Sequence, residues 1–171
     1  MAEGGAAPGK RPSPIRETDD EAFALAAKLC REAHYGALAA LDPESGRPVA
    51  TRIAFAMDGS HPVTLVSDLS SHTNALKADG RCSLLVGEPG RGDPLAHPRV
   101  TLHCDARSVE RRNEEHRRLR TLWLAAHPKA ELYIDFADFG FWRFEVARAS
   151  LNGGFGKAYE LTGEEFAEAF V

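Results

Sequence analysis

The sequence has little cysteine and no long apolar run. These two shortages argue against a disulfide-rich protein and against a membrane protein. Its three cysteines, Cys30, Cys82 and Cys104, are odd in number, widely spaced and free of any C-x-x-C pair. We interpret them as reduced, buried thiols of a cytoplasmic protein rather than as a disulfide framework. No apolar run approaches the length that a helix needs to cross a bilayer, so a membrane protein is not expected.

Positive charge is not in excess either. The chain carries 21 lysines and arginines against 25 acidic residues, which gives a formal net charge of -4. This balance argues against broad nucleic-acid binding. The one arginine-rich stretch, residues 111–120, is interleaved with glutamates and holds no aromatic ring, which is typical of a salt-bridged helix face.

Length and composition favour one globular domain. The 171 residues are enough to bury a core without a disulfide or a structural metal, and a hydrophobic content of 43% is ordinary. The first 14 residues are rich in Gly, Ala and Pro and lack the apolar stretch of a signal peptide. We expect residues 1–17 to be a disordered tail and residues 18–171 to be a single domain. No two of the seven histidines stand four residues apart, so no metal site is expected.

Alternating apolar runs predict a mainly β protein with helices at its periphery. Strands are expected over residues 35–41, 49–57, 63–67, 82–86, 99–110, 139–146 and 149–151. Helices are expected from Thr18, as the N-cap of a capping box, to about His34, from His72 to a Gly80 C-cap, over 110–126 and over 164–170. Six or more strands joined by hairpins indicate an antiparallel β-barrel.

A cluster of small polar residues follows the expected strand at 63–67 and precedes a helix. Its hydroxyl, amide and imidazole groups come from Ser67, Ser70, Ser71, His72, Thr73 and Asn74. Free backbone N–H groups and the helix dipole favour an anion at such a place. The alternative is an N-cap loop whose hydroxyls satisfy the first helical turn. The residues alone leave both interpretations open.

Several short motifs, in a fixed order over roughly residues 18–165, carry a resemblance to a known superfamily. They are YGAL at 35–38, PVAT at 48–51 with IAF at 53–55, LSSHTNAL at 69–76, RVTL at 99–102, HP at 127–128 with Tyr133, DF at 138–139 with WR at 142–143, and GGFGKA at 153–158. With these motifs the chain resembles the FMN-binding split-barrel superfamily, which includes pyridoxamine 5'-phosphate oxidase. The closer resemblance is to its haem-utilisation branch, whose barrels are similar to the CREG (cellular repressor) proteins.

The resemblance implies a homodimer of antiparallel split β-barrels, with peripheral α-helices and with FMN bound at the subunit interface. In the superfamily the second barrel strand lies along the isoalloxazine ring, and the loop after the third strand holds the phosphate. The cofactor-binding candidates that follow are Thr51, Arg52, Ile53 and Phe55 on the strand, Ser67, Ser71, His72 and Thr73 in the loop, and Trp142. Arg52 or an arginine of the partner subunit would complete the neutralisation of the phosphate. Trp142 would wall the flavin or fill the barrel.

The implied function is that of an FMN-dependent oxidoreductase for a small aromatic or heterocyclic substrate, with the redox chemistry carried by the flavin. Deazaflavin is an alternative cofactor. Pyridoxamine phosphate oxidases place basic residues at the positions of His72 and Thr73, so pyridoxamine phosphate is not the expected substrate. The sequence names no catalytic acid or base.

Two other functions remain open from the sequence. The first is haem binding or utilisation, as in the closest branch. Its full-length enzymes carry a further C-terminal domain, whereas this sequence ends at Val171, shortly after the glycine-rich motif; haem degradation is therefore less favoured. The second is a non-catalytic, CREG-like dimeric interaction module with a filled flavin groove. The donor-rich loop favours a ligand over a filled groove.

Overall fold

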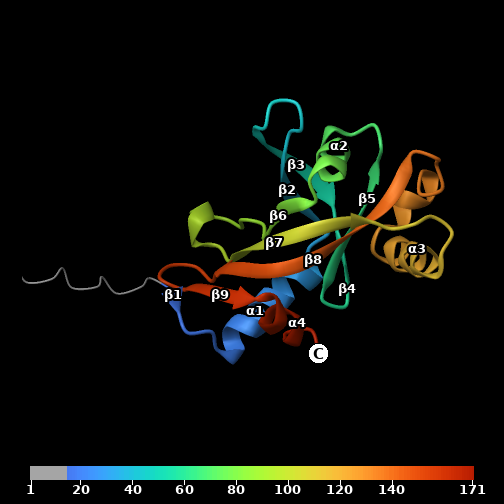
Figure 1. Ribbon diagram of the computed structural model, residues 1–171. Coiled ribbons are helices and arrows are strands. Elements are labelled where there is room, and N and C mark those ends of the chain that lie inside the picture. Colours follow the sequence, from blue (N-terminus) through green and yellow to red (C-terminus); the bar gives the residue numbers. More distant parts are fainter. Residues whose placement is uncertain (1–14) are drawn as a thin grey trace, which may run out of the picture.

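The computed structural model describes residues 15–171, which form one curled sheet with helices around it (Figure 1). The strands are β1 (Ile15–Arg16), β2 (Tyr35–Leu41), β3 (Pro48–Ala54), β4 (Ala56–Asp58), β5 (His61–Ser67), β6 (Arg81–Val86), β7 (Arg99–Ser108), β8 (Phe139–Asn152) and β9 (Ala158–Thr162). The α-helices are α1 (Asp20–Glu32), α2 (Ser71–Ala78), α3 (Glu114–Ala126) and α4 (Gly163–Glu168), with short 3-10 turns at Pro94–Ala96 and Pro128–Leu132. Of the expected disordered tail, residues 1–14 lie outside the described residues, whereas Ile15 and Arg16 form β1 and pair with β9.

The sheet is curled but not closed. Its strand order is β1-β9-β8-β7-β6-β2-β3, and β5 pairs with β4 and with the first part of β8. Every pairing is antiparallel except that of β1 with β9. Within residues 15–171 no ladder joins β3 to β5, and the Thr64 hydroxyl crosses this gap to donate to the carbonyl of Ala54 at 2.7 Å. The mainly β, antiparallel architecture expected from the sequence is confirmed.

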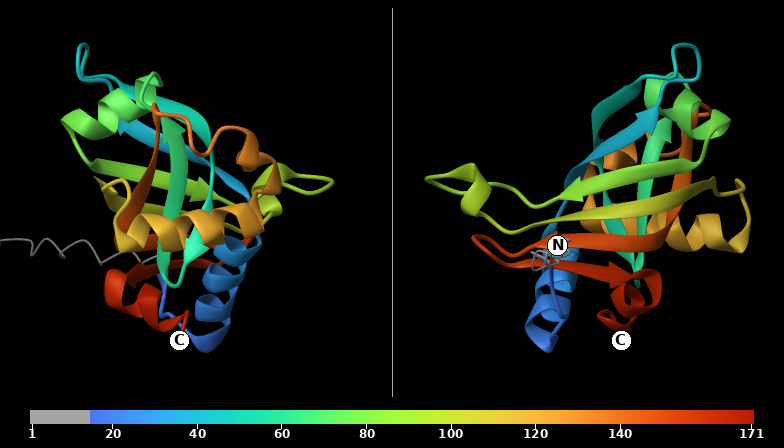
Figure 2. Two further views of the ribbon diagram at one scale, coloured as in Figure 1. Left: turned by 90° about the vertical axis from the view of Figure 1, so that its right-hand side faces the viewer. Right: turned by 60° about the vertical axis from the view of Figure 1, so that its left-hand side comes forward.

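The alternation of side chains gives the sheet a buried inner face and an open outer face. Leu38, Leu84 and Leu102 stand side by side on β2, β6 and β7 and are at most 1% exposed. The neighbouring residues along these strands, Ala39, Ser83 and His103, also stand side by side and turn to the other face. This face is not covered by any helix in the described part of the chain (Figure 2).

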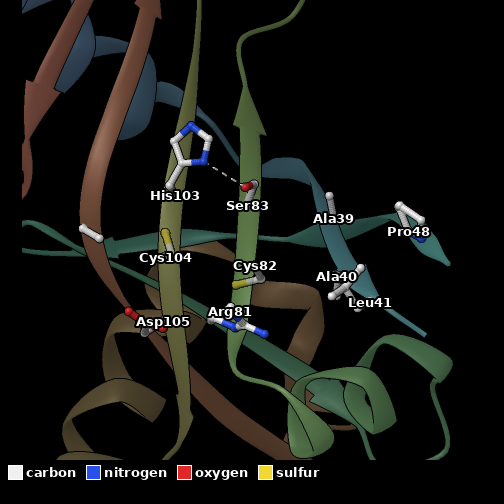
Figure 3. Close-up of a pocket in the computed structure, with 11 residues that line it drawn as sticks. Ala39, Ala40, Leu41, Pro48, Arg81, Cys82, Ser83, His103, Cys104 and Asp105 are labelled. Atoms are coloured by element: carbon white, nitrogen blue, oxygen red, sulfur yellow. Dashed lines mark hydrogen bonds between the residues drawn. The ribbon is translucent and has the colours of Figure 1, made fainter. Parts of the chain in front are cut away.

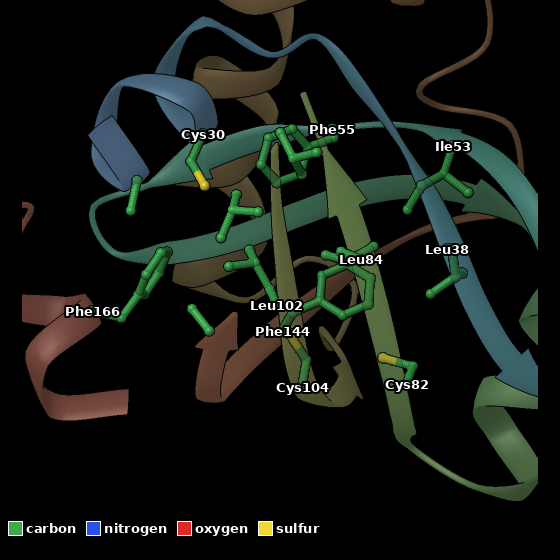
Figure 4. Close-up of a cluster of buried hydrophobic side chains, with 14 of the residues drawn as sticks. Cys30, Leu38, Ile53, Phe55, Cys82, Leu84, Leu102, Cys104, Phe144 and Phe166 are labelled. Atoms are coloured by element: carbon green, nitrogen blue, oxygen red, sulfur yellow. The ribbon is translucent and has the colours of Figure 1, made fainter. Parts of the chain in front are cut away.

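Two apolar cores fix the helices to the sheet. The main core fills the inner face and includes Phe55, Phe144 and Trp142. Cys30 of α1 and Phe166 of α4 pack into the same core (Figure 4). The second core lies between α3 and the β5–β8 ladder and is centred on Trp123, Leu119 and Phe141. Burying each large side chain stabilises the fold by about 1.5–3 kcal/mol, so packing rather than helix propensity holds these helices.

An ion-pair network ties α3 to the barrel. Arg118 of α3 and Arg143 of β8 both donate to the carboxylate of Asp58, which ends β4. The hydrogen bond from Arg118 is the main reason that the pKa of Asp58 is held below its usual value, against the opposing effect of burial. The carboxylate therefore joins three elements that are far apart in the sequence.

The structure corrects several sequence-based boundaries at the N-terminal half. The N-cap of α1 is Asp19, whose carboxylate accepts from the Ala22 N–H at 2.8 Å, and not Thr18, whose hydroxyl donates to the carbonyl of Glu160. The expected strand 49–57 breaks at Phe55, because the Phe55 N–H turns away to the carbonyl of His34. Gly80 is not a C-cap with positive φ; a side chain there would meet the carbonyl of Ala106 at 2.7 Å.

The C-terminal half differs in three further ways. Residues 139–152 form one long strand, since a β-bulge at Ala147 keeps β8 paired with β7 on both sides of the break that the sequence suggested. Strand β9 was not predicted at all, although Tyr159 and Leu161 are buried on either side of the exposed Glu160. The expected helix 110–126 begins only at Glu114, where the Asn113 side chain accepts from the His116 N–H.

Candidate functional site

In the polar loop, residues 67–74, the hydroxyl groups of Ser67 and Thr73 form hydrogen bonds with other groups of the protein. Thr73 is fully buried, and its hydroxyl donates to the carbonyl of Ser67 at 2.8 Å. The Ser67 hydroxyl donates in turn to a carboxylate oxygen of Asp138 at 2.6 Å. Ser71 is exposed in the first turn of α2. Two of the four loop candidates therefore satisfy protein groups, and a carboxylate lies beside them.

Thr51 and His72 are the strand and loop candidates that the structure brings together. The Thr51 hydroxyl lies 3.3 Å from Nδ1 of His72, so β3 and α2 meet at this point. The other ring nitrogen, Nε2, is buried and has no hydrogen-bond partner within residues 15–171. Burial lowers the pKa of His72, so the ring is neutral at pH 7 and adds no positive charge to the loop.

The remaining candidates lie apart from this pair. Arg52 follows Thr51 and turns to the outer face, where its guanidinium stacks over the ring of Tyr35 at 5.2 Å. Ile53, Phe55 and Trp142 are at most 5% exposed and belong to the main core. Their side chains are committed to packing. Within residues 15–171 β3 pairs with β2 alone, so on that side the backbone of β3 is free for a flat ligand.

A second candidate site lies on the outer face of the sheet and was not identified from the sequence (Figure 3). It is a hollow of about 500 Å³, within the range of about 300–1,000 Å³ that is typical of ligand sites. Its lining is mostly small and apolar and consists of Ala39, Ala40, Leu41, Pro48, Arg81, Cys82, Ser83, His103, Cys104, Asp105 and Ala147. Its one imidazole is that of His103.

His103 bridges three neighbouring strands at this hollow. Its Nδ1 lies 3.3 Å from the hydroxyl of Ser83 on β6, and its Nε2 lies 3.4 Å from that of Ser150 on β8. Burial, and then the charge of Arg148, lower the pKa of the imidazole. The β-bulge at Ala147 falls directly opposite, and such bulges are common next to functional sites.

The cysteines beside the hollow are structural. Cys82 and Cys104 stand opposite each other on β6 and β7, and both are buried and free, as the sequence suggested. Burial raises the pKa of Cys82 to about 12 and raises that of Cys104 further. They stay protonated at neutral pH, and a protonated thiol is a poor nucleophile and a poor metal ligand.

Within residues 15–171 no three His, Cys, Asp or Glu side chains are gathered as they would be around a metal ion. No helix in the same range combines the length and the apolar character needed to cross a bilayer.

The sequence could have indicated the outer face only in part. Alternation along residues 99–106 placed His103 opposite the buried Leu102 and Cys104. The hydroxyls beside its ring come from positions 20 and 47 residues away. The register of β6, β7 and β8 brings these hydroxyls next to the His103 ring, and no local sequence pattern specifies that register.

The family and the relatives of this chain agree with the split-barrel architecture. A family model described as "CREG, beta-barrel" matches residues 17–168. Among curated proteins, the chloroplastic "Non-canonical heme oxygenase HOZ" of Arabidopsis thaliana is 35% identical over 128 residues, which are 73% of this chain and 38% of that protein.

Solved structures show the same fold. The heme binding protein of Mycobacterium smegmatis is 34% identical with a TM-score of 0.79, over 93% of this chain and 62% of that one. A pyridoxinephosphate oxidase family protein of Clostridium acetobutylicum is 14% identical with a TM-score of 0.67, over 87% of this chain and 99% of that one, and it shows the fold alone. The chain thus spans less than two thirds of both haem-related proteins. It belongs to the CREG beta-barrel family.

Proposed function

We propose that this protein binds haem in the hollow on the outer face of the sheet. The observation that carries the proposal is the hollow itself: a concave, mostly apolar surface of about 500 Å³ with one imidazole in it. A porphyrin is flat and largely apolar, and an imidazole is a common ligand of its iron. The names of the Arabidopsis and Mycobacterium relatives, which are 35% and 34% identical, support the same ligand.

The lining residues would contribute to haem binding in different ways. The small side chains of Ala39 and Ala147 leave room for a flat ring, and Arg81 supplies positive charge at one end of the hollow. Arg81 is already paired with Asp79, so its charge is partly neutralised. Bound haem would supply one-electron and oxygen chemistry, and the chain would orient it and limit its contact with water.

A haemin titration followed by absorption spectroscopy tests the proposal. We expect a saturable Soret band at one haemin per chain. Ala39→Trp fills the hollow and should weaken binding at least about tenfold, whereas Glu44→Trp adds the same ring to the exposed β2–β3 hairpin and should change nothing. A protein that gives no saturable Soret band, or an Ala39→Trp variant that binds like the wild type, would overturn the proposal.

FMN binding, with an oxidoreductase reaction on a small aromatic or heterocyclic substrate, is the second candidate. The observation in its favour is the buried, unpartnered Nε2 of His72 beside Thr51 and the free edge of β3. The fit to a phosphate is incomplete, because Ser67 is bonded to Asp138 and the nearby Lys77 is paired with Asp68 at 2.9 Å. A cation from Arg52 or from a second subunit would have to complete the site. Quenching of FMN or deazaflavin fluorescence that is lost in His72→Ala would support this function independently of haem.

We also propose that the protein works as a homodimer. Leu85 is 43% exposed on the outer face, and Leu41, which is 40% exposed, lines the hollow itself, so a second copy seated here would cover haem bound in the hollow. Sedimentation analysis should show a dimer that Leu85→Glu dissociates; a monomeric wild type would contradict this. A dimer that takes up neither haemin nor flavin would instead support the non-catalytic, CREG-like interaction module.

A further inference from the structure

We propose that one end of the sheet is a docking surface for an anionic phospholipid bilayer. This loop end consists of residues 87–98, between β6 and β7, and residues 153–157, between β8 and β9. The two loops project from the same end of the sheet (Figure 2). The inference is independent of haem binding, because other residues line the hollow on the outer face.

Each loop holds a large apolar side chain in the solvent. Phe155 is 89% exposed in the β8–β9 hairpin, and Leu95 is 67% exposed in the 3-10 turn of the other loop. The two loops are in contact, since a Cβ at Gly154 would lie 3.0 Å from the carbonyl oxygen of Ala96. Phe155 and Leu95 directly adjoin these two residues along the chain. Exposed apolar side chains that gather at one place indicate an interaction surface.

Hydrogen bonds inside the 87–98 loop hold Leu95 in this position. The carboxylate of Asp93 accepts from the Leu95 N–H at 2.8 Å, and Nη1 of Arg99 donates to the Leu95 carbonyl at 3.1 Å. Nε2 of His97 lies 3.1 Å from the carbonyl oxygen of Arg91 and closes the loop. A loop that is already held in one shape loses less conformational entropy when it binds.

The β8–β9 hairpin presents Phe155 in a similar way. The Gly153 N–H donates to the carbonyl of Lys157 at 2.7 Å, and the Lys157 N–H donates to the carbonyl of Gly154 at 3.2 Å. Gly154 and Gly156 have positive φ values of 104° and 69°, which glycine adopts without strain. Phe155 therefore stands at a defined turn, between two residues that have no side chain to cover it.

Positive charge lies beside the two apolar side chains. Arg91 and Lys157 are exposed in the loops themselves. Arg16 of β1 reaches the hairpin, because its Nη2 lies 4.0 Å from where a Cβ of Gly156 would be. These three cations are contributed by three segments that are far apart in the sequence, and the fold brings them to the same end.

The acidic residues nearby lie further back or are bonded within a loop. Glu88 begins the 87–98 loop and lines a separate pocket beside α1. The carboxylate of Asp93 is bonded inside the loop, as described above. Glu17 and Glu160 follow the pairing of β1 with β9, so they lie further from the hairpin than Arg16 does. The charges next to the exposed apolar side chains are therefore mainly positive.

A bilayer suits this combination better than a small molecule does. Small-molecule sites are concave, whereas these loops project from the sheet (Figure 2). The boundary between headgroups and acyl chains accepts apolar side chains that project into it, and lysine and arginine side chains beside them pair with anionic headgroups. The whole chain has a formal net charge of -4, so the local charge of the loop end, rather than the net charge, would orient the protein on the membrane.

Co-sedimentation of the full chain with lipid vesicles tests the proposal. The wild type should bind vesicles of phosphatidylglycerol and phosphatidylcholine, and it should bind phosphatidylcholine alone more weakly. Phe155→Ser and Leu95→Ser should each weaken binding at least about tenfold. Lys157→Glu should weaken binding to the anionic vesicles only. Leu132→Ser is the matched control, because Leu132 is 79% exposed on the 3-10 turn after α3, and this variant should bind like the wild type.

Tryptophan fluorescence gives a second, positive measurement. Trp123 and Trp142 are 0% and 5% exposed, so they should not respond to vesicles. Phe155→Trp should shift its emission to the blue on vesicles and be quenched by brominated acyl chains, whereas Leu132→Trp should show neither effect. A wild type that binds no anionic vesicles, or a Phe155→Ser variant that binds them like the wild type, would overturn the proposal. Dissociation of a wild-type dimer by Phe155→Ser would assign the loop end to a second copy and would overturn it too.

Discussion

The hydroxyl of Ser67 lies 2.6 Å from a carboxylate oxygen of Asp138, and this contact joins the polar loop to the segment that leads into β8. The backbone N–H of Asp68 reinforces the junction by donating to the carbonyl of Asp138 at 2.7 Å. The polar loop therefore has a structural role, because it connects β5 to the segment before β8. A phosphate bound there would have to approach the carboxylate of Asp138. For this reason we propose haem on the outer face ahead of FMN in the loop.

Ser67→Ala should lower the free energy of unfolding by about 1 kcal/mol, because it removes a partly buried hydrogen bond to a carboxylate. Urea unfolding measures the change. Ser71→Ala, at an exposed position of the same loop, is the matched control and should be neutral. Equal effects of the two substitutions would show that the Ser67–Asp138 contact does not stabilise the fold.

Arg111 should be essential for the order of residues 136–139. Its Nη1 donates to the carbonyls of Phe136, Ala137 and Phe139 at 3.1, 2.6 and 3.0 Å. Arg111→Ala should cost about 1 kcal/mol and speed hydrogen exchange in this segment. Arg111→Lys should recover only part of the lost stability, since an ammonium group cannot reproduce the planar fork of the guanidinium group. Lys28→Ala, at an exposed pair in α1, is the control; unchanged exchange in Arg111→Ala would refute the prediction.

Stability should depend on pH through Asp58. Its folded-state pKa lies below its usual value of 3.8, mainly because Arg118 donates to it. The stabilisation is therefore fully present above about pH 4 and is lost as the pH falls through the folded-state pKa. Asp58→Asn should cost roughly 2 kcal/mol at pH 7, between the values for surface and buried pairs, because Arg118 is half-exposed.

The comparison of wild type and Asp58→Asn over pH isolates this carboxylate from the others. Thermal unfolding at pH 7 and at pH 3 should show a difference that shrinks in acid. A difference that stays constant between the two pH values would mean that the network of Asp58 with Arg118 and Arg143 does not stabilise the folded state through its charge.

Gly80 should resist substitution although its φ is not positive. A Cβ there would lie 2.7 Å from the carbonyl oxygen of Ala106, so Gly80→Ala should push α2 away from β7 and cost about 2 kcal/mol. Gly140 on β8 meets nothing within 4 Å, and Gly140→Ala should change stability by less than about 0.5 kcal/mol. Chemical unfolding of the two variants compares them directly, and equal stabilities would contradict the close packing at Gly80.

Much of the fold was readable from the sequence because most strands alternate cleanly. Strand β2 was predicted to the residue, because its apolar run ends at the turn residues that begin with Asp42 and Pro43. Strand β9 and the division at Phe55 were missed because tertiary contacts decide them. The Phe55 N–H donates to the carbonyl of His34, which lies between α1 and β2. No local sequence pattern predicts this hydrogen bond.

The candidate sites were less accessible to sequence reasoning. The polar loop stood out because hydroxyl groups cluster beside a helix start, yet Thr73 and Ser67 serve the loop itself. His103 did not stand out, because its hydroxyl neighbours and the small side chains around it come from three other strands. A site built across strands depends on register, and register is set by the whole sheet.

Anomalous diffraction at the iron edge, from crystals of the protein grown with haemin, tests the central claim most directly. We expect one iron peak per chain on the outer face of the sheet, in the hollow lined by Ala39, Ser83 and His103. An iron peak beside His72 in the polar loop, or well-ordered crystals in which the hollow near Ala39 and Ser83 holds no iron, would contradict it.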